Sequence, residues 1–212
     1  MRFADRSEAG RRLAAALAGH AGEACVVYGL PRGGVAPALE VARRLRAPLD
    51  LLITRKIGHP LAPEYAIAAV GTSGEVVRNE TEVAKLDPAW FEREVERQAA
   101  EAERRRRRYL GGRAAVNAEG KTAILVDDGL ATGLTMQAAI LEARRRRPRR
   151  IVVAAPVGPP ETVAALRALA DEVVCLHTPA GFEAIGEFYD RFEPVGDEEV
   201  AALLAAAERE AA

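Results

Sequence analysis

Two hydrophobic periods alternate along the chain, and the change from one to the other repeats. Short apolar runs of strand length, such as 24–28 and 49–54, are separated by stretches with apolar residues at helical spacing, such as 35–45. Strands that alternate with helices are typical of parallel βαβ units. The pattern therefore predicts an α/β fold built on a mostly parallel sheet.

The same rhythm returns in the second half of the chain. The expected strands span 122–126, 151–155 and 172–176, and the expected helices span 7–18, 135–147, 161–169 and 197–210. Helices on both faces of a parallel sheet form three layers, α/β/α. We expect residues 1–212 to form a single domain of this kind.

The middle of the chain has a different texture. Two short β-like runs, 67–70 and 75–77, flank Gly71-Thr72-Ser73-Gly74 and predict a hairpin. The preceding stretch, 58–64, contains two prolines and a glycine and is expected to be a mobile loop. A long helix should then begin after the N-cap Asp87, with Pro88 at its first position, and end at Gly111-Gly112.

Composition limits the classes of function. The chain is 49% apolar and 29% charged, and its net charge of −1 gives no overall field that attracts nucleic acid or an anionic membrane. No apolar run reaches membrane length and the first residues lack a signal-peptide core, so a cytoplasmic location is expected. Cys25 and Cys175 lie in separate apolar runs without CxxC spacing, so we expect both to be buried and reduced.

The strongest chemical signal is the segment ILVDDGLATGLT at 124–135. A buried strand delivers two carboxylates, Asp127 and Asp128, at its carboxyl end, where open parallel sheets bind ligands. The turn after them can aim backbone N–H groups, the hydroxyls of Thr132 and Thr135 and a helix N-terminus at a phosphate, and Gly133 permits close approach. The carboxylates suit hydroxyl groups of the same ligand. A phosphate beside a vicinal diol describes a ribose 5-phosphate.

This segment resembles the signature of type I phosphoribosyltransferases that binds 5-phosphoribosyl 1-pyrophosphate (PRPP): apolar residues, two acids, small residues, then Thr-Gly-x-Thr. The order of elements is also similar over most of the chain. The resemblance implies that Asp127 and Asp128 act on the ribose hydroxyls as the catalytic pair. It implies that the 5′-phosphate is bound by Gly129, Ala131, Thr132, Gly133, Leu134 and Thr135. Two other interpretations of the segment remain to be weighed. In the first, the aspartates only form the turn. In the second, the segment is a Walker B strand, but that fold requires an upstream G-x-x-x-x-G-K-[ST], which the sequence lacks.

The resemblance assigns further parts of the site. The loop Pro31-Arg32-Gly33-Gly34 stands where the family binds pyrophosphate, which suits a guanidinium and glycine N–H groups at a helix start. Arg55 and Lys56 end the second strand, and Lys56 is favoured as the basic residue that reaches the pyrophosphate. Residues 57–80 would form a flexible lid with its hairpin, and 178–212 a hood and C-terminal helix. The hood aromatics proposed to bind the base are Phe182, Phe188 and Tyr189, although aromatic residues also fill small cap cores.

Three hypotheses follow for function. The favoured one is an Mg²⁺-dependent transferase that moves the 5-phosphoribosyl group from PRPP to a nitrogenous base and releases pyrophosphate. The metal would be held mainly by PRPP, with help from Asp127 and Asp128, rather than by a dedicated protein site. The alternatives are a non-catalytic sensor of PRPP or a nucleotide, in contact with nucleic acid, and a hydrolase that uses water as acceptor.

The partners expected from the sequence are therefore small molecules. Two arginine runs, 104–108 and 144–150, could contact nucleic acid, but they lack interleaved aromatic residues and fit solvated helix ion pairs and a helix C-terminus better. The histidines are scattered without ligand spacing, so no zinc site is expected. No membrane partner is expected, and a homodimer is compatible with the family resemblance.

Overall fold

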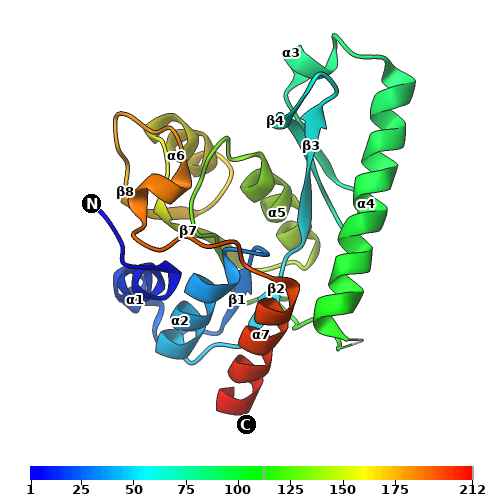
Figure 1. The fold of residues 1–212 in the computed structure, drawn as a ribbon. Helices are drawn as coiled ribbons and strands as arrows, with labels where there is room; N and C mark the ends of the chain where they lie inside the picture. The colour runs from blue at the N-terminus through cyan, green and yellow to red at the C-terminus, as the bar shows by residue number, and fades with distance from the viewer. Residues whose placement is uncertain (112, 212) are drawn as a thin grey trace.

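The computed structural model describes residues 1–111 and 113–211, and its centre is a five-stranded sheet (Figure 1). The strand order is β2-β1-β6-β7-β8, and every neighbouring pair is parallel. The strands are β1 (Cys25–Gly29), β2 (Leu49–Leu51), β6 (Thr122–Val126), β7 (Arg150–Val157) and β8 (Glu172–His177). The parallel sheet predicted from the alternating periods is confirmed.

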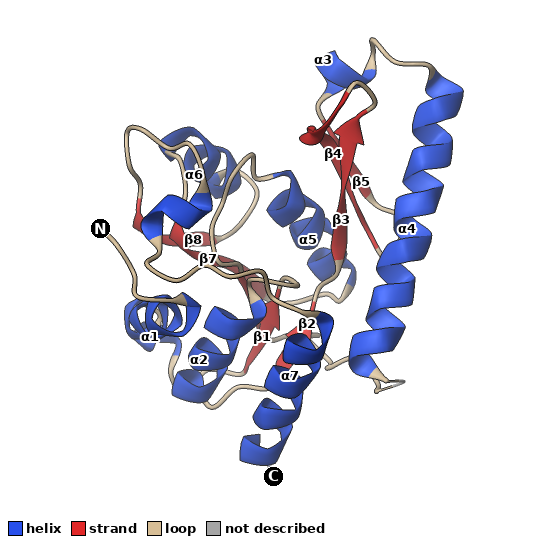
Figure 2. Cartoon of the chain, viewed as in Figure 1, coloured by secondary structure: helices blue, strands red, loops and turns tan. Residues whose placement is uncertain are grey.

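Helices cover both faces of this sheet, which gives three layers (Figure 2). Side chains alternate along β6, so Ile124 and Val126 pack on one face while Ala123 and Leu125 pack on the other. The first face is covered by α1 (Arg6–Ala16), α2 (Val35–Leu45) and α7 (Asp197–Ala211), and the second by α5 (Leu134–Arg145) and α6 (Pro160–Arg167). Both faces of the strands are buried, which explains why the strands are continuously apolar in sequence.

A second, antiparallel sheet stands beside the first and is formed by β3 (Thr54–His59), β4 (Ala62–Gly71) and β5 (Val76–Arg78). One of its faces packs Ile57 and Ile67 against Phe91 of the long helix α4 (Pro88–Leu110). Its other face packs against α5 through residues that include Ala69 and Leu134. The short helix α3 (Glu80–Val83) links β5 to the segment that leads into α4.

The loop predicted over 58–64 is wrong, because β3 and β4 run through most of it. Gly58 makes this close pairing feasible, since a Cβ there would lie 2.0 Å from the carbonyl oxygen of Pro63. The turn after β4 is also anchored, because Thr72 Oγ1 and the Ser73 N–H both donate to the Glu142 carboxylate of α5, each at 3.1 Å. Leu61, at the β3–β4 turn, is 89% exposed. The region expected to be a flexible lid forms a sheet packed between α4 and α5, with an exposed tip, and its flexibility stays a prediction.

The ends of the long helix α4 follow the sequence, whereas the bounds of one expected strand do not. The Asp87 side chain accepts from the Ala89 N–H at 3.1 Å at the start of α4, and Gly111 ends the helix with a φ of 55°. Gly112, the second residue of the predicted stop, lies outside the described residues. The strand expected over 49–54 is divided, because β2 ends at Leu51 and β3 begins at Thr54 in the other sheet.

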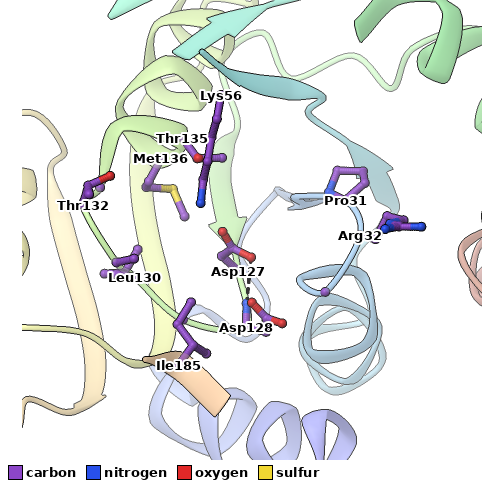
Figure 3. Close-up of a pocket in the computed structure, with 14 residues that line it drawn as sticks. Pro31, Arg32, Lys56, Asp127, Asp128, Leu130, Thr132, Thr135, Met136 and Ile185 are labelled. Carbon is purple, nitrogen blue, oxygen red and sulfur yellow. Dashed lines mark hydrogen bonds between the residues drawn. The ribbon is translucent and has the colours of Figure 1, made fainter. Parts of the chain in front are cut away.

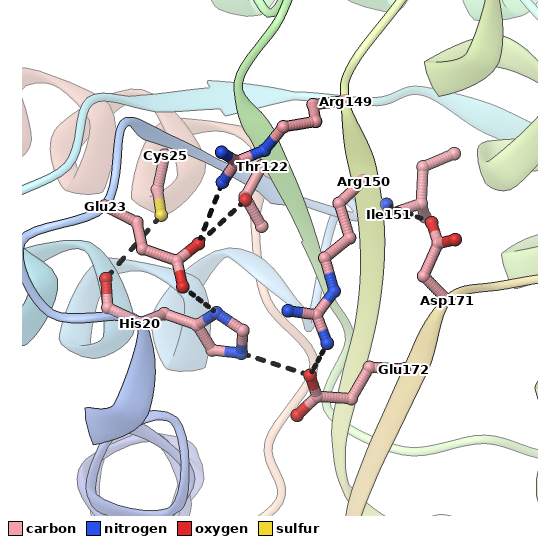
Figure 4. A network of polar contacts seen from close by, with 9 residues as sticks. All are labelled: His20, Glu23, Cys25, Thr122, Arg149, Arg150, Ile151, Asp171 and Glu172. Atoms are coloured by element: carbon pink, nitrogen blue, oxygen red, sulfur yellow. Dashed lines mark hydrogen bonds and ion pairs between the residues drawn. The ribbon is translucent and has the colours of Figure 1, made fainter.

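A polar network joins the amino ends of the parallel strands (Figure 4). The His20 ring is buried, with Nδ1 lying 3.5 Å from Glu23 and Nε2 lying 3.3 Å from Glu172. Thr122 Oγ1 donates to Glu23 at 3.0 Å, and Arg150 pairs with Glu172 at 2.6 Å. These contacts connect the amino ends of β6, β7 and β8 to the chain before β1, at the end of the sheet opposite the carboxyl ends of the strands.

The two cysteines are free thiols, as expected, but only Cys25 is fully buried, whereas Cys175 is partly exposed. Cys175 lies on β8, an edge strand of the sheet that is covered less completely than β1. None of the described helices combines the length and apolarity needed to span a bilayer.

Candidate functional site

The candidate site lies at the carboxyl ends of β1 and β6, which are neighbours in the sheet, with Gly29 opposite Val126. The chain leaves β1 toward β2 on one side and leaves β6 toward β7 on the other. Such a switch point opens a crevice between two loops, where open parallel sheets bind ligands. A pocket is found there (Figure 3). Its lining residues are Pro31, Arg32, Gly33, Lys56, Asp127, Asp128, Gly129, Leu130, Ala131, Thr132, Gly133, Thr135, Met136 and Ile185.

The turn between β6 and α5, together with the first residues of α5, presents a row of unused hydrogen-bond donors. Within the described part of the chain, no backbone N–H from Ala131 to Met136 donates to a protein acceptor. The hydroxyl oxygen of Thr135, the second residue of α5, is buried and has no protein partner. Gly133 takes a φ of 78° as the N-cap of α5, a conformation that favours glycine. Donors gathered at a helix N-terminus form a cradle for an anion.

The cradle is held in shape from behind by β7 and α6. The Leu130 N–H donates to the Val157 carbonyl oxygen at 2.8 Å, and Thr162 Oγ1 donates to the Ala131 carbonyl oxygen at 2.8 Å. These bonds use groups that face away from the pocket. The turn is therefore fixed by the fold and its inward donors remain available to a ligand.

The two adjacent acids lie in different environments. The Asp128 N–H donates to Asp127 Oδ1 at 2.9 Å. Burial and the neighbouring charge of Asp128 raise the pKa of Asp127, while Lys56 acts in the opposite direction. Figure 3 shows Lys56 reaching from β3 toward Asp127. The pair places carboxylate oxygens in the pocket beside the turn, and their role toward a ligand stays a prediction.

Arg6, which the sequence analysis did not identify, neutralises the second acid. Its Nε lies 2.7 Å from Asp128 Oδ2, and both side chains are nearly buried, at 13% and 11% exposure. Arg6 belongs to α1, 122 residues away along the chain. No local pattern marks such a pair, because it is created only when α1 packs beside the sheet.

The loop after β1 fits tightly against the acids. An added Cβ on Gly33 would lie 1.9 Å from Asp128 Oδ2, and one on Gly34 would lie 2.7 Å from the Val126 carbonyl oxygen. The peptide bond between Pro31 and Arg32 is cis. Among the described residues, the N–H groups of Arg32 and Gly33 donate to no protein acceptor.

The Arg32 guanidinium itself is directed away from the two acids (Figure 3). It is 44% exposed and lies 3.9 Å from Asp197 of α7. The backbone of this loop therefore reaches the pocket while the arginine head group does not. The pyrophosphate role of Arg32, Gly33 and Gly34 stays a prediction.

Lys56 and Arg55 are separated by the alternation of the strand. Lys56 lines the pocket, whereas Arg55 Nε donates to Gln98 Oε1 of α4 at 3.0 Å on the opposite face of β3. Burial and the nearby Arg105 and Arg97 lower the pKa of Arg55. Of the two basic residues at this position, only Lys56 can face a ligand held by the acids.

The hood aromatics are placed differently from one another. Tyr189 is only 2% exposed, packs against Phe3 and Phe192, and donates its hydroxyl to the Asp128 carbonyl oxygen at 2.6 Å. Its ring therefore has no open face for a base in this structure. Phe182 and Phe188 stack on each other at 5.7 Å and remain partly exposed. The hood residue that lines the pocket is Ile185, which sequence reasoning did not single out.

The donor set suits a cation that brings most of its own ligands. Among residues 1–111 and 113–211, no group of three or more His, Cys, Asp and Glu side chains could hold a metal ion. Asp127 Oδ1 and Asp128 Oδ2 are already used within the protein, which leaves one oxygen of each acid. Two carboxylate oxygens fit Mg²⁺, which keeps several waters and binds phosphates.

Comparisons with known proteins point to one family. The family model of the phosphoribosyl transferase domain matches residues 4–190. Two Mycobacterium tuberculosis proteins provisionally named phosphoribosyl transferases are 46% identical to 98% of this chain, which spans only 47% of their length, about half. The crystal structure of TT1426 from Thermus thermophilus is 47% identical, has a TM-score of 0.82 and covers 97% of this chain and 99% of its own.

Proposed function

This chain belongs to the phosphoribosyl transferase family, and on that basis we propose that it binds PRPP with Mg²⁺ and transfers the 5-phosphoribosyl group to a nitrogenous base. The observation that carries this proposal is the buried Thr135 hydroxyl, which has no protein partner and lies in a turn of unused N–H donors beside two carboxylates. Such a site complements a phosphate joined to a vicinal diol. The ribose 5-phosphate part of PRPP has this chemistry.

The lining residues divide the ligand into three parts. The cradle from Ala131 to Thr135 takes the 5′-phosphate, and the remaining oxygens of Asp127 and Asp128 accept the ribose hydroxyls. Lys56 and the N–H groups of Arg32 and Gly33 face the pyrophosphate from the other side of the acids. The phosphate cradle and the two acids come from one segment after β6, whereas Lys56 comes from β3 and the remaining N–H donors come from the loop after β1. The ribosyl centre is held between these parts of the fold.

The reaction is a displacement at C1 of the ribose. The C1–O bond to pyrophosphate breaks and its electron pair leaves with the pyrophosphate, while the base nitrogen gives its lone pair to a new C1–N bond and loses its proton. Positive charge develops on the ribose, and the adjacent carboxylates stabilise it while Lys56 stabilises the leaving group. The PRPP oxygens would hold Mg²⁺ with help from Asp127 and Asp128, and the bound metal would neutralise further charge on the pyrophosphate. Catalysis then rests on positioning and electrostatics.

Calorimetric titration of PRPP with Mg²⁺ tests the proposal without knowledge of the acceptor. We expect micromolar binding to the wild type and its loss in the Asp127→Asn/Asp128→Asn variant. The matched control is Asp190→Asn, because Asp190 pairs with Arg2 on the surface, and its affinity should equal that of the wild type. Wild-type protein that is folded but does not bind PRPP would contradict the proposal.

Pyrophosphate release then separates an enzyme from a sensor. The wild type and the double variant are incubated with PRPP, Mg²⁺ and a panel of purine and pyrimidine bases. Release that requires one base and both acids supports the transferase. Tight PRPP binding without release for any base would favour the non-catalytic sensor, and release without a base would favour the hydrolase.

A further inference from the structure

Arg6 occupies a position that its own helix does not favour. It is the first residue of α1, where the helix dipole is positive and a cation is destabilising. The N-cap Asp5 compensates this end of the helix, since its side chain accepts from the Glu8 N–H at 2.8 Å. A cation at the start of α1 is therefore explained by a contact outside the helix.

That contact is a set of three interactions that fix the guanidinium. Its Nε lies 2.7 Å from Asp128 Oδ2, its Nη1 donates to the Glu193 carbonyl oxygen at 2.9 Å, and its Cζ lies 3.8 Å from the centre of the Phe192 ring. A charge-assisted bond between two nearly buried groups is stronger than an exposed ion pair. Arg6 is thus held in one place, and it holds one oxygen of Asp128.

Asp128 is confined on its other sides as well. Gly33 packs against Oδ2 so closely that even a methyl group there would collide with it. The Asp128 carbonyl oxygen accepts from the Tyr189 hydroxyl at 2.6 Å. With Oδ2 committed to Arg6, Oδ1 is the oxygen of this carboxylate that remains for a ligand in the pocket.

Two of the residues that confine Asp128, Arg6 and Tyr189, come from the first and last parts of the chain, and these two parts are joined to each other. The Phe3 N–H donates to the Phe188 carbonyl oxygen, and the Asp190 N–H donates to the Phe3 carbonyl oxygen, both at 2.8 Å. Tyr189 and Phe192 stack at 4.9 Å within this junction. The N-terminal segment and the hood therefore form one unit that presents Arg6 to the acid.

We propose that Arg6 is a positioning residue for the ribose: by holding Asp128 Oδ2, it aims Oδ1 at one ribose hydroxyl and keeps this carboxylate from turning away. The inference rests on the proposed function, since it assigns how that site orients its sugar. Arg6 is not one of the residues that line the pocket, and of its three partners only Asp128 lines it. Its effect on a ligand therefore passes through Asp128, which makes the ribose hydroxyl a specific reporter.

The test compares ribose 5-phosphate with its 2-deoxy and 3-deoxy analogues and with inorganic phosphate, by calorimetry, on the wild type and on Arg6→Gln. The wild type should bind ribose 5-phosphate about tenfold or more tightly than the analogue that lacks the hydroxyl held by Asp128. In Arg6→Gln this preference should fall several-fold, while inorganic phosphate, which contacts only the cradle, should bind as in the wild type. Arg6→Lys keeps the positive charge and should restore part of the preference.

A matched control lies on the same helix. Arg12 pairs with Glu8 and lies over the Phe3 ring at 5.4 Å, so Arg12→Gln removes an α1 arginine with a ring contact but no link to Asp128. Its sugar preference should be unchanged. If Arg6→Gln does not fold, the wild type is compared with Arg6→Lys and with Arg6→Gln/Asp128→Asn, in which both charges of the pair are removed. The double variant should bind ribose 5-phosphate and its deoxy analogue equally.

The outcomes separate this inference from the proposed function. If Arg6→Gln weakens inorganic phosphate and all sugars equally, or leaves the hydroxyl preference intact, Arg6 is only structural and the inference is overturned while the site stands. If the wild type binds none of the phosphorylated sugars nor PRPP, both the proposed function and the inference are overturned.

Discussion

Replacing Gly33 by alanine would place a methyl group where the Asp128 carboxylate lies. The new Cβ would be 1.9 Å from Oδ2 and 2.5 Å from Cγ, far inside van der Waals contact. A flexible surface side chain could swing away, but this one is nearly buried and is bonded to Arg6. The carboxylate must therefore leave its position, and the bond to Arg6 must be lost or distorted.

The expected magnitudes follow from the bonds that are broken. A hydrogen bond to a charged group contributes about 1.5–3 kcal/mol, so loss of the Arg6 contact should lower the free energy of unfolding by roughly that amount. The displaced acid also loses its bond to a ribose hydroxyl, which is of the same order. PRPP affinity should then fall about 10- to 150-fold.

Calorimetric titration of PRPP with Mg²⁺ and urea denaturation measure the two effects. Gly19→Ala is the matched control, because a Cβ at Gly19 meets no described atom within 4 Å, and it should leave PRPP affinity unchanged. Gly34→Ala is the opposite of this control, because a large loss of stability is expected. Its Cβ would meet the Leu30 and Val126 carbonyl oxygens at 2.7 Å, so it should destabilise the whole fold. Wild-type affinity in Gly33→Ala would refute the placement of Asp128 in the ribose site.

Three further changes test other parts of the structure. The pKa of Asp127 is raised, so ionisation of this acid opposes folding as the pH rises. Asp127→Asn should therefore raise the free energy of unfolding at neutral pH, and this gain should shrink at acidic pH. Urea denaturation at neutral and at acidic pH that shows no gain would contradict this. Asp50 is fully buried and lies 3.3 Å from Arg146. Asp50→Ala should therefore lower the free energy of unfolding by about 3–5 kcal/mol, and a decrease of less than about 1 kcal/mol would refute the role of Asp50 as a paired buried charge. Lys56→Met should weaken pyrophosphate binding about tenfold, whereas Arg55→Met should leave it unchanged. Equal pyrophosphate affinities of the two variants in a calorimetric titration would contradict the assignment of these residues to opposite faces of β3.

Local patterns predicted the parallel half of the fold well. The strand over 122–126 and the helix over 35–45 match β6 and α2 because their apolar residues are contiguous or strictly periodic, and their partners need not be known. The ends of α4 were also predictable, since Asp87, Pro88 and Gly111 act through their own backbone geometry. The two acids and the turn after them belong to the same class of predictable features, because a single segment supplies all of them.

Features that depend on distant partners escaped prediction. β3 passes through a stretch rich in proline and glycine, and it is a strand because Ile57 is buried against α4 and Gly58 lets the paired strand approach. Asp50 stands in an apolar run, yet it is retained in the core by an arginine 96 residues away. Arg6 meets Asp128 across 122 residues. In each case the decisive contact is set by packing of whole elements, which residue spacing does not encode.

The site combines features that do not favour the folded protein taken alone. Burial raises the pKa of Asp127, the Thr135 hydroxyl is buried without a protein partner, and a series of N–H groups faces the pocket unbonded. Each of these groups could be stabilised by a ligand that carries a phosphate and hydroxyl groups, and none is stabilised by the core. Arg6 differs, because it already satisfies Asp128 within the protein. Asp128 is thus held in place by the protein, whereas Asp127 has no such cationic partner at bonding distance among the described residues and would gain most from a ligand. This difference allows two adjacent carboxylates at one strand end to take separate roles.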